Sequence, residues 1–239
     1  LEHHLLRQRE FGATLGIGGV TLANNVTGTG SLIKTASNLA TLTGNNTGFT
    51  GQLSITDGFV AVQNVAALGS GIVSVDDGAT LAIQSATDQV FSAALYGAGD
   101  INKSGAGRLT INGTNAFTGD LNIAAGTLQV AGSGSSGFGN IDLASGTTLN
   151  LHSDFGRGLN NTISGAGRVV KTGTGYTTIQ NGGLYTGGTE LLAGGLRVTD
   201  LADLGTGPIN TAAGTVLVLT HTDANPVGVN SIMQGAGIF

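Results

Sequence analysis

The sequence predicts an all-β solenoid, a coil of short strands built from one unit that recurs three times. The units open with Gly28-Thr29-Gly30, Gly97-Ala98-Gly99 and Gly165-Ala166-Gly167. Their starts are separated by about 69 residues, and a further start, Gly235-Ala236-Gly237, follows at a similar interval. Short runs of alternating apolar and polar residues fill each unit. Repeats of this kind form architectures in which each unit buries its apolar face against the next.

The composition agrees with a packed β protein. The 239 residues include 43 glycines, 40% are hydrophobic and only 10% are charged, with a net charge of −5. This length gives room for a large core, and the apolar content excludes a chain that is disordered for lack of core material. The pI of about 5.1 offers no basic stripe for phosphates, so we do not expect nucleic acid as a partner. Because no apolar run reaches about 20 residues, no membrane-spanning helix is predicted.

The strands follow from the alternation of apolar and polar residues, taken along the chain. Each i, i+2 apolar pair is expected to point inward, while the residue between its members points to water. In the first unit the pairs are Leu53/Ile55, Val60/Val62, Val73/Val75 and Leu81/Ile83. In the second they are Leu121/Ile123, Leu128/Val130, Ile141/Leu143 and Leu149/Leu151. In the third they are Thr189/Leu191, Leu196/Val198, Ile209/Thr211 and Leu217/Leu219.

Glycines at matching positions predict the corners between strands. They are Gly58, Gly126 and Gly194 in one series and Gly78, Gly146 and Gly214 in another. Glycine adopts positive φ without a steric penalty and so permits sharp turns. We expect each unit to make three turns of about 23 residues, and about ten turns at ~4.8 Å each make a rod of roughly 50 Å. A propeller with large blades is the alternative, but the unit is too long for one common blade.

The domain organisation is predicted to be a single solenoid over residues 12–239. Its repeats are expected at 28–96, 97–164 and 165–234, with a truncated fourth from 235. Residues 1–11 differ in composition and are expected to be a cloning remnant or a short cap. We therefore expect the chain to be a piece of a longer repeat array.

Three consecutive segments of the second unit carry a family resemblance. They are Gly97 to Lys103, Leu109 to Gly119 and Leu121 to Val130, and the first unit adds Leu68 to Gly71 and Gly78 to Leu81. Together they resemble the passenger-associated repeat of bacterial autotransporters, and the resemblance extends over residues 28–239.

The resemblance implies a right-handed parallel β-helix that is secreted across the outer membrane and displayed on a Gram-negative cell surface. It also implies an outer-membrane tether through a C-terminal β-barrel that is not present in this chain. The usual roles of the family are adhesion, self-association and structural extension. The implied partners are a host cell-surface or extracellular-matrix ligand, or the same protein on another cell. No cofactor and no catalytic residue come with the repeat.

Two sets of repeated residues are candidates for function. Lys34, Lys103 and Lys171 recur from unit to unit, and three turns would place them about 14 Å apart along one face. They would form a sparse basic ladder for an acidic glycan, or, as we favour, solvated residues that discourage strand edges from pairing. Phe49, Phe117 and Tyr185 each precede Thr-Gly. They would either stack on sugars at the surface or, as we favour, fill the core.

Catalytic and metal-binding motifs find little support. His152-Ser153-Asp154 and His221-Thr222-Asp223 place suggestive residue types side by side, but a triad depends on spatial geometry, so we interpret them as exposed turns. Gly132 to Gly137 matches G-x-G-x-x-G, yet a strand follows it where a dinucleotide site needs a helix. Aspartates such as Asp57 do not recur between units, although two acids from adjacent turns remain possible. No cysteine and only 4 histidines are available for metals.

The sequence therefore favours a non-enzymatic cell-surface segment that acts as an adhesin or as an adhesin stalk. Stacked turns would present rows of Thr, Asn and Ser at fixed spacing, and weak contacts repeated along a rod give avidity. Because fold does not fix function, a polysaccharide-binding or polysaccharide-cleaving β-helix is one alternative. An inert structural spacer is the other.

Overall fold

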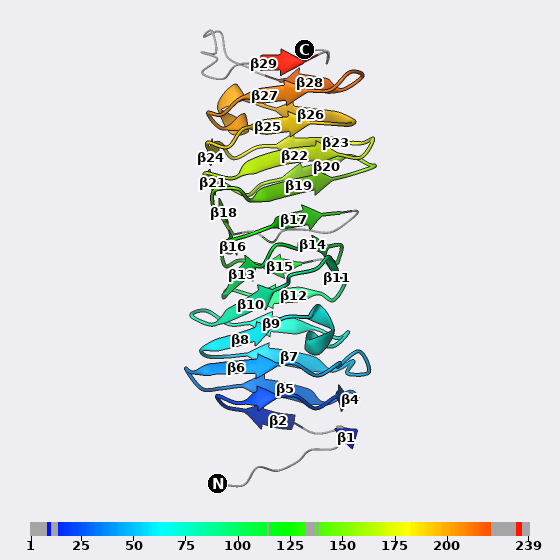
Figure 1. The fold of residues 1–239 in the computed structure, drawn as a ribbon, viewed down its shortest axis with the longest axis vertical. Coiled ribbons are helices and arrows are strands. Elements are labelled where there is room, and N and C mark those ends of the chain that lie inside the picture. Colours follow the sequence, from blue (N-terminus) through cyan, green and yellow to red (C-terminus); the bar gives the residue numbers. More distant parts are fainter. Residues whose placement is uncertain are drawn as a thin grey trace.

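The computed structural model describes residues 9–10, 14–113, 115–131, 137, 139–220 and 233–235. The described chain is a parallel β-solenoid of about 10 turns, with the early strands at one end of the stack and the late strands at the other (Figure 1). Short strands from successive turns pair in parallel and form three long stacks and two shorter ones. Within the described residues, no helix is long and apolar enough to cross a membrane.

The strands are grouped by sheet. The six-stranded sheet contains β2 (Thr14–Ile17), β5 (Ser31–Lys34), β7 (Gln52–Ile55), β9 (Val73–Val75), β12 (Leu95–Gly97) and β15 (Ala116–Phe117). The nine-stranded sheet contains β3 (Thr21–Leu22), β6 (Leu39–Leu42), β8 (Phe59–Val62), β10 (Thr80–Gln84), β13 (Asp100–Ser104), β16 (Leu121–Ile123), β18 (Ile141–Leu143), β21 (Ile163–Gly165) and β24 (Gly183–Tyr185). The eight-stranded sheet contains β11 (Gln89–Phe91), β14 (Arg108–Ile111), β17 (Thr127–Val130), β19 (Thr148–His152), β22 (Arg168–Thr172), β25 (Thr189–Leu191), β27 (Ile209–Thr211) and β29 (Met233–Gly235).

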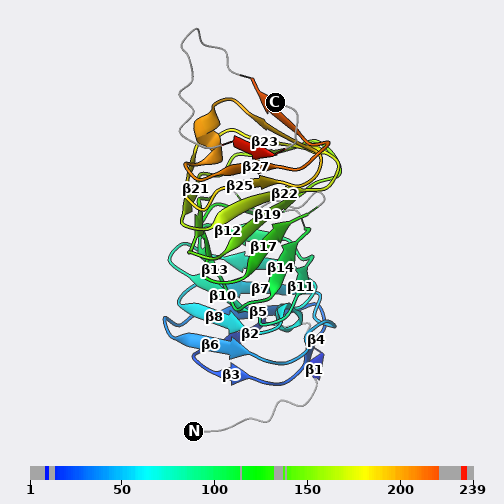
Figure 2. The same cartoon turned by 45° about the horizontal axis from the view of Figure 1, so that its top comes forward.

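The smaller sheets complete the coil. The four-stranded sheet contains β20 (Arg157–Leu159), β23 (Tyr176–Ile179), β26 (Gly195–Val198) and β28 (Val216–Leu219), and the two-stranded sheet pairs β1 (Arg9–Glu10) with β4 (Val26–Thr27). Two short 3-10 helices, η1 (Val65–Leu68) and η2 (Leu201–Leu204), interrupt the strand pattern. In the earlier turns the chain passes from the six-stranded sheet to the nine-stranded sheet. In the later turns it reaches the nine-stranded sheet from the four-stranded sheet, which therefore takes the place of the six-stranded sheet. Figure 2 shows the stacks from a tilted direction.

The core is the column of inward-facing residues that alternation predicts. Leu53, Ile55, Val60 and Val62 are fully buried, and the other predicted pairs are buried with them. Leu219 differs, since it is 39% exposed at the end of β28, the last strand of the four-stranded sheet. The expected inward direction of the apolar pairs is therefore confirmed for the other positions.

The predicted corner glycines all have positive φ, between 68° and 79°. At Gly126 a second constraint applies, because a Cβ added there would lie 2.5 Å from the carbonyl oxygen of Gly105 on the preceding turn. Close stacking of corners and left-handed backbone thus require glycine at the same position.

The turns are shorter than the sequence analysis predicts, and this changes how the repeat maps onto the coil. Leu32, Leu53, Val73 and Leu95 stack on one another, so three full turns lead from position 32 only as far as position 95. One sequence repeat leads further, from Leu32 to Ile101, which lies in the next sheet. One sequence repeat therefore spans three full turns and about one third of a fourth turn. Each repeat thus begins on a different face of the solenoid from the repeat before it.

Candidate functional site

The three repeated lysines occupy the interior. Lys34, Lys103 and Lys171 are each 0% exposed, so the expectation of a solvated surface ladder is wrong. They also lie on three different sheets, in β5, β13 and β22, rather than along one face. The physical reason is register: each lysine follows an inward apolar residue by two positions, and strand alternation turns it inward despite its charge.

Backbone carbonyls replace water around each buried ammonium. Lys103 Nζ donates to the carbonyl oxygens of Gly105 at 2.6 Å, of Ser104 at 3.4 Å and, on the following turn, of Ala125 at 2.9 Å. Lys171 repeats this pattern with Thr172, Gly173 and Ala193, at 2.6, 2.9 and 3.3 Å. Lys34 donates to the carbonyl oxygens of Ala36 and Asp57. Each lysine therefore ties its own corner to the corner of the next turn.

Burial also changes the protonation of these groups. Burial lowers the pKa of Lys171 to about 8; the charge of Asp154 opposes this shift and that of Arg157 adds to it. Burial likewise lowers the pKa of Lys103, with Asp88 opposing. Since the ammonium groups contact carbonyl oxygens and are closed to solvent, their role in the fold is structural, and a soluble ligand has no access to them.

The repeated aromatic residues fill the core, as favoured. Phe49, Phe117 and Tyr185 are at most 2% exposed. Each ring packs against a positive-φ glycine of the next turn, and a Cβ added to Gly137 would lie 2.4 Å from the Phe117 ring. The aromatic residue recurs in each unit because its ring packs against a glycine in the turn that follows.

Tyr185 brings a hydroxyl into this core, and a threonine compensates for it. The Tyr185 hydroxyl lies 2.5 Å from Thr189 Oγ1, which in turn donates to the carbonyl oxygen of Leu204 at 3.1 Å. Burial raises the pKa of Tyr185, so the phenol stays protonated. In the second unit Phe117 and Leu121 stand at the same two positions. The hydrogen-bonded pair Tyr185 and Thr189 therefore occupies the two positions that the apolar pair Phe117 and Leu121 occupies in the second unit.

The His152-Ser153-Asp154 motif does not assemble a nucleophile, base and acid. Ser153 is buried and its hydroxyl donates to the carbonyl oxygen of Phe155 rather than to the histidine. His152 Nδ1 lies 3.0 Å from Thr172 Oγ1, and its Nε2 lies 3.6 Å from Asp154. Because Thr172 donates its proton to Asn150 Oδ1, His152 Nδ1 acts as the donor to Thr172. His221-Thr222-Asp223 and residues 132–136 lie outside the described residues.

Aspartates in the described part link turns to one another. Asp100 Oδ1 accepts the backbone N–H of Asp120 at 2.9 Å, and Asp120 Oδ1 accepts that of Asn140 at 3.0 Å. Asp88 forms an ion pair with Arg108 at 2.8 Å. Among the residues described, no group of three or more His, Cys, Asp or Glu side chains is placed to hold a metal ion. These carboxylates are thus spread along the corners and do not converge.

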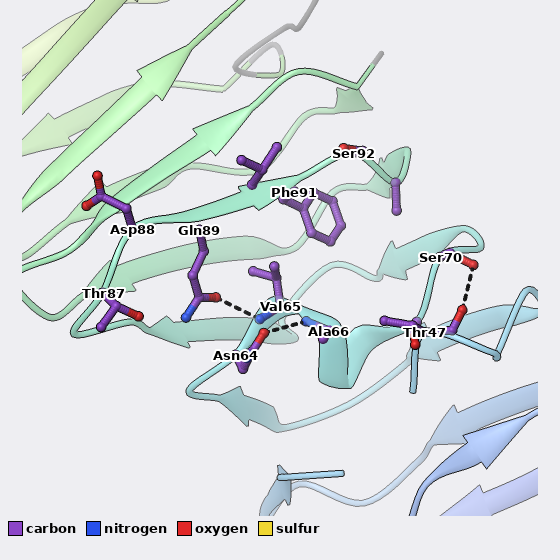
Figure 3. Close-up of a pocket in the computed structure, with 13 residues that line it drawn as sticks. Thr47, Asn64, Val65, Ala66, Ser70, Thr87, Asp88, Gln89, Phe91 and Ser92 are labelled. Carbon is purple, nitrogen blue, oxygen red and sulfur yellow. Dashed lines mark hydrogen bonds between the residues drawn. The ribbon is translucent and has the colours of Figure 1, made fainter. Parts of the chain in front are cut away.

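A groove of about 470 Å³ lies where η1 faces the first strand of the eight-stranded sheet (Figure 3). Gln89 closes part of this edge, since its Oε1 accepts the N–H of Val65 at 2.8 Å and its Nε2 donates to the carbonyl oxygen of Gln63 at 2.7 Å. Asn64 caps η1 by accepting the N–H of Ala66. The edge of β11 is thereby covered, as strand edges in stable proteins usually are.

A second surface feature was not anticipated from the sequence. Phe155 lies two residues before β20, and Tyr176 and Arg197 lie in β23 and β26 of the same four-stranded sheet, so the three residues stand on three successive turns; we call them the aromatic strip. Phe155 is 79% exposed and Tyr176 is 39% exposed, and the Arg197 guanidinium lies 5.6 Å from the centre of the Tyr176 ring. The alternation of inward and outward residues along a strand could have predicted that Tyr176 and Arg197 are exposed. It makes no prediction for Phe155, because that residue lies in a corner between strands.

Comparison with known proteins finds one family model and one curated relative that are similar to this chain. The family model of the passenger-associated-transport repeat matches residues 101–130 and 169–198. The adhesin BmaC autotransporter of Brucella suis biovar 1 (strain 1330) is 28% identical over 191 residues, which is 66% of this chain and 5% of that protein. No solved structure matches the chain.

The chain is thus a parallel β-solenoid with two segments that match the passenger-associated-transport repeat, and it is similar in sequence to an autotransporter adhesin. The two matched segments begin one residue after the start of β13 and of β22, in different sheets, so the family repeat itself is rotated by one face between its two copies.

Proposed function

We propose that this chain is a segment of a bacterial cell-surface adhesin, where it serves as an adhesive surface or as the stalk that carries one. The observation that carries the proposal is the similarity to an autotransporter adhesin over 191 residues. Its site of action is the cell exterior. Its partners are a host cell-surface or matrix ligand, or a second copy of the protein on another cell.

The mechanism follows from the coil. Apolar pairs, buried lysines and corner aspartates are all committed to holding turns together, which leaves the outward residues free to vary. On the nine-stranded sheet, for example, Asn122 Nδ2 donates to Asn102 Oδ1 at 3.0 Å across adjacent turns. Such fixed rows of polar side chains offer many weak contacts at a constant rise, and multivalency lets these contacts act together.

Adhesion is tested by coating beads with the full chain and presenting them to cultured cells, to matrix proteins and to one another. Beads that carry the chain are expected to adhere or to clump, whereas beads coated with an unrelated β protein of similar pI are not. If the coated beads neither adhere nor clump, adhesion by this segment is contradicted and the chain is a spacer.

A further inference from the structure

We propose that the aromatic strip is a binding site for a carboxylate-bearing glycan that crosses successive turns of the solenoid obliquely. This inference rests on the adhesive function proposed above and names the ligand class for it. The strip differs from the η1 groove because its three side chains are exposed to solvent, whereas the polar groups at the η1 groove are largely bonded within the protein.

The geometry of the strip comes from glycines that allow its turns to stack closely. A Cβ added to Gly175 would lie 2.4 Å from the backbone of Phe155, so the two residues stack directly. A Cβ added to Gly195 would lie 2.2 Å from Tyr176 Cε1, so the tyrosine ring covers that glycine. Phe155 and Tyr176 thus present two aromatic rings on adjacent turns, which are separated by about 4.8 Å along the axis.

The charge of the strip selects for an anion at one end. Arg108 and Arg168 are exposed and paired with Asp88 and Glu190. Arg197 is also exposed, but among residues 14–220 as described it has no carboxylate partner and lies over the Tyr176 ring. A guanidinium held over an aromatic face is well placed to bind a carboxylate with two parallel hydrogen bonds.

The opposite end of the strip suits sugar hydroxyls. Asp154 is adjacent to Phe155, its side chain is 55% exposed, and its Oδ1 accepts the N–H of Thr174 at 3.1 Å. Its second oxygen, near His152, offers an acceptor for a hydroxyl and would repel a carboxylate. The polarity of the site is therefore set: the acidic sugar binds at Arg197, and a neutral part of the glycan stacks on Phe155.

The test measures binding of two acidic probes to the full chain by titration calorimetry. One probe is a hexasaccharide of alternating glucuronate and N-acetylglucosamine, and the other is a tetramer of sialic acid. Each is compared with its carboxyl-reduced form. Phe155→Ser and Arg197→Gln are each expected to weaken binding at least tenfold. Phe59→Ser and Arg168→Gln, which are exposed residues on other sheets, are expected to change it less than twofold.

Several outcomes overturn the inference. It fails if neither acidic probe binds, if the carboxyl-reduced forms bind equally well, or if the strip variants bind like the controls. Circular dichroism and thermal melts establish that the variants are folded, which is expected because Phe155 and Arg197 are exposed. Bead adhesion separates the two proposals: adhesion that survives both strip variants contradicts the glycan site alone, whereas absence of adhesion by the unmodified chain contradicts the adhesive function.

Discussion

At the scale of single residues, position in the strand decides burial even for lysine. Lys103 stands two positions after Ile101, and both side chains point inward. A buried ammonium is costly unless its donors are satisfied. Carbonyl oxygens from two corners meet this need, and one of them belongs to the next turn. The charge therefore contributes to the cohesion between turns, which a surface lysine would not.

The pKa of Lys171 predicts a pH dependence of stability. The folded-state pKa of about 8 lies below the unfolded value of about 10.4, so the unfolded chain holds more protons between these pH values. The free energy of unfolding contributed by Lys171 therefore rises as pH increases from about 8 to about 10.4. Urea unfolding of the unmodified chain and of Lys171→Met, measured across this range, is expected to show the unmodified chain gaining relative stability. A constant difference would contradict a depressed pKa.

At the scale of elements, corners set the stacking distance between turns. Gly78 and Gly126 both have positive φ, at 78° and 73°. At Gly78 a Cβ meets nothing within 4 Å, whereas at Gly126 it meets the Gly105 carbonyl oxygen at 2.5 Å and Lys103 Nζ at 2.8 Å. At Gly78 only the backbone conformation disfavours a larger residue. At Gly126 the adjacent turn also leaves no room for a side chain.

This difference predicts unequal costs for the same substitution. Gly78→Ala is expected to lower the free energy of unfolding by about 1–2 kcal/mol, which is the cost of a left-handed residue with a Cβ. Gly126→Ala has the same cost and adds about 1–3 kcal/mol for overpacking against Gly105 and Lys103. Chemical denaturation of both variants provides the measurement. Equal losses at the two sites would mean that corner stacking does not limit residue 126.

At the scale of the whole molecule, the repeat and the turn do not coincide. Three turns from Ile101 lead to Ile163, whereas one sequence repeat leads on to Val169, in the neighbouring sheet. A feature that recurs in each unit therefore winds around the rod. The lysines follow this path through β5, β13 and β22.

Deleting one sequence repeat tests this rotation. Removal of residues 102–169 joins Ile101 to Val170 and is expected to leave a folded, shorter coil, because each unit presents the same surface to the next. The later turns are expected to rotate by about one third of a turn. Spin labels at Ser54 and Thr178 then move to different faces, while labels at Ser54 and Leu184 come to the same face. Pulsed EPR distances measure both pairs, and unchanged faces would show that the repeat fills whole turns.

The sequence by itself determined the strands, the corners and the core. Alternation placed Leu53 and Ile55 inside, and spacing placed Phe117 and Tyr185 there, because both signals report local strand geometry. The tertiary structure alone decided the length of each turn, and with it which face each unit presents. Turn length depends on how side chains from three sheets fill one cross-section, which no local pattern encodes. The placement of Phe155, Tyr176 and Arg197 on successive turns followed from that non-local packing.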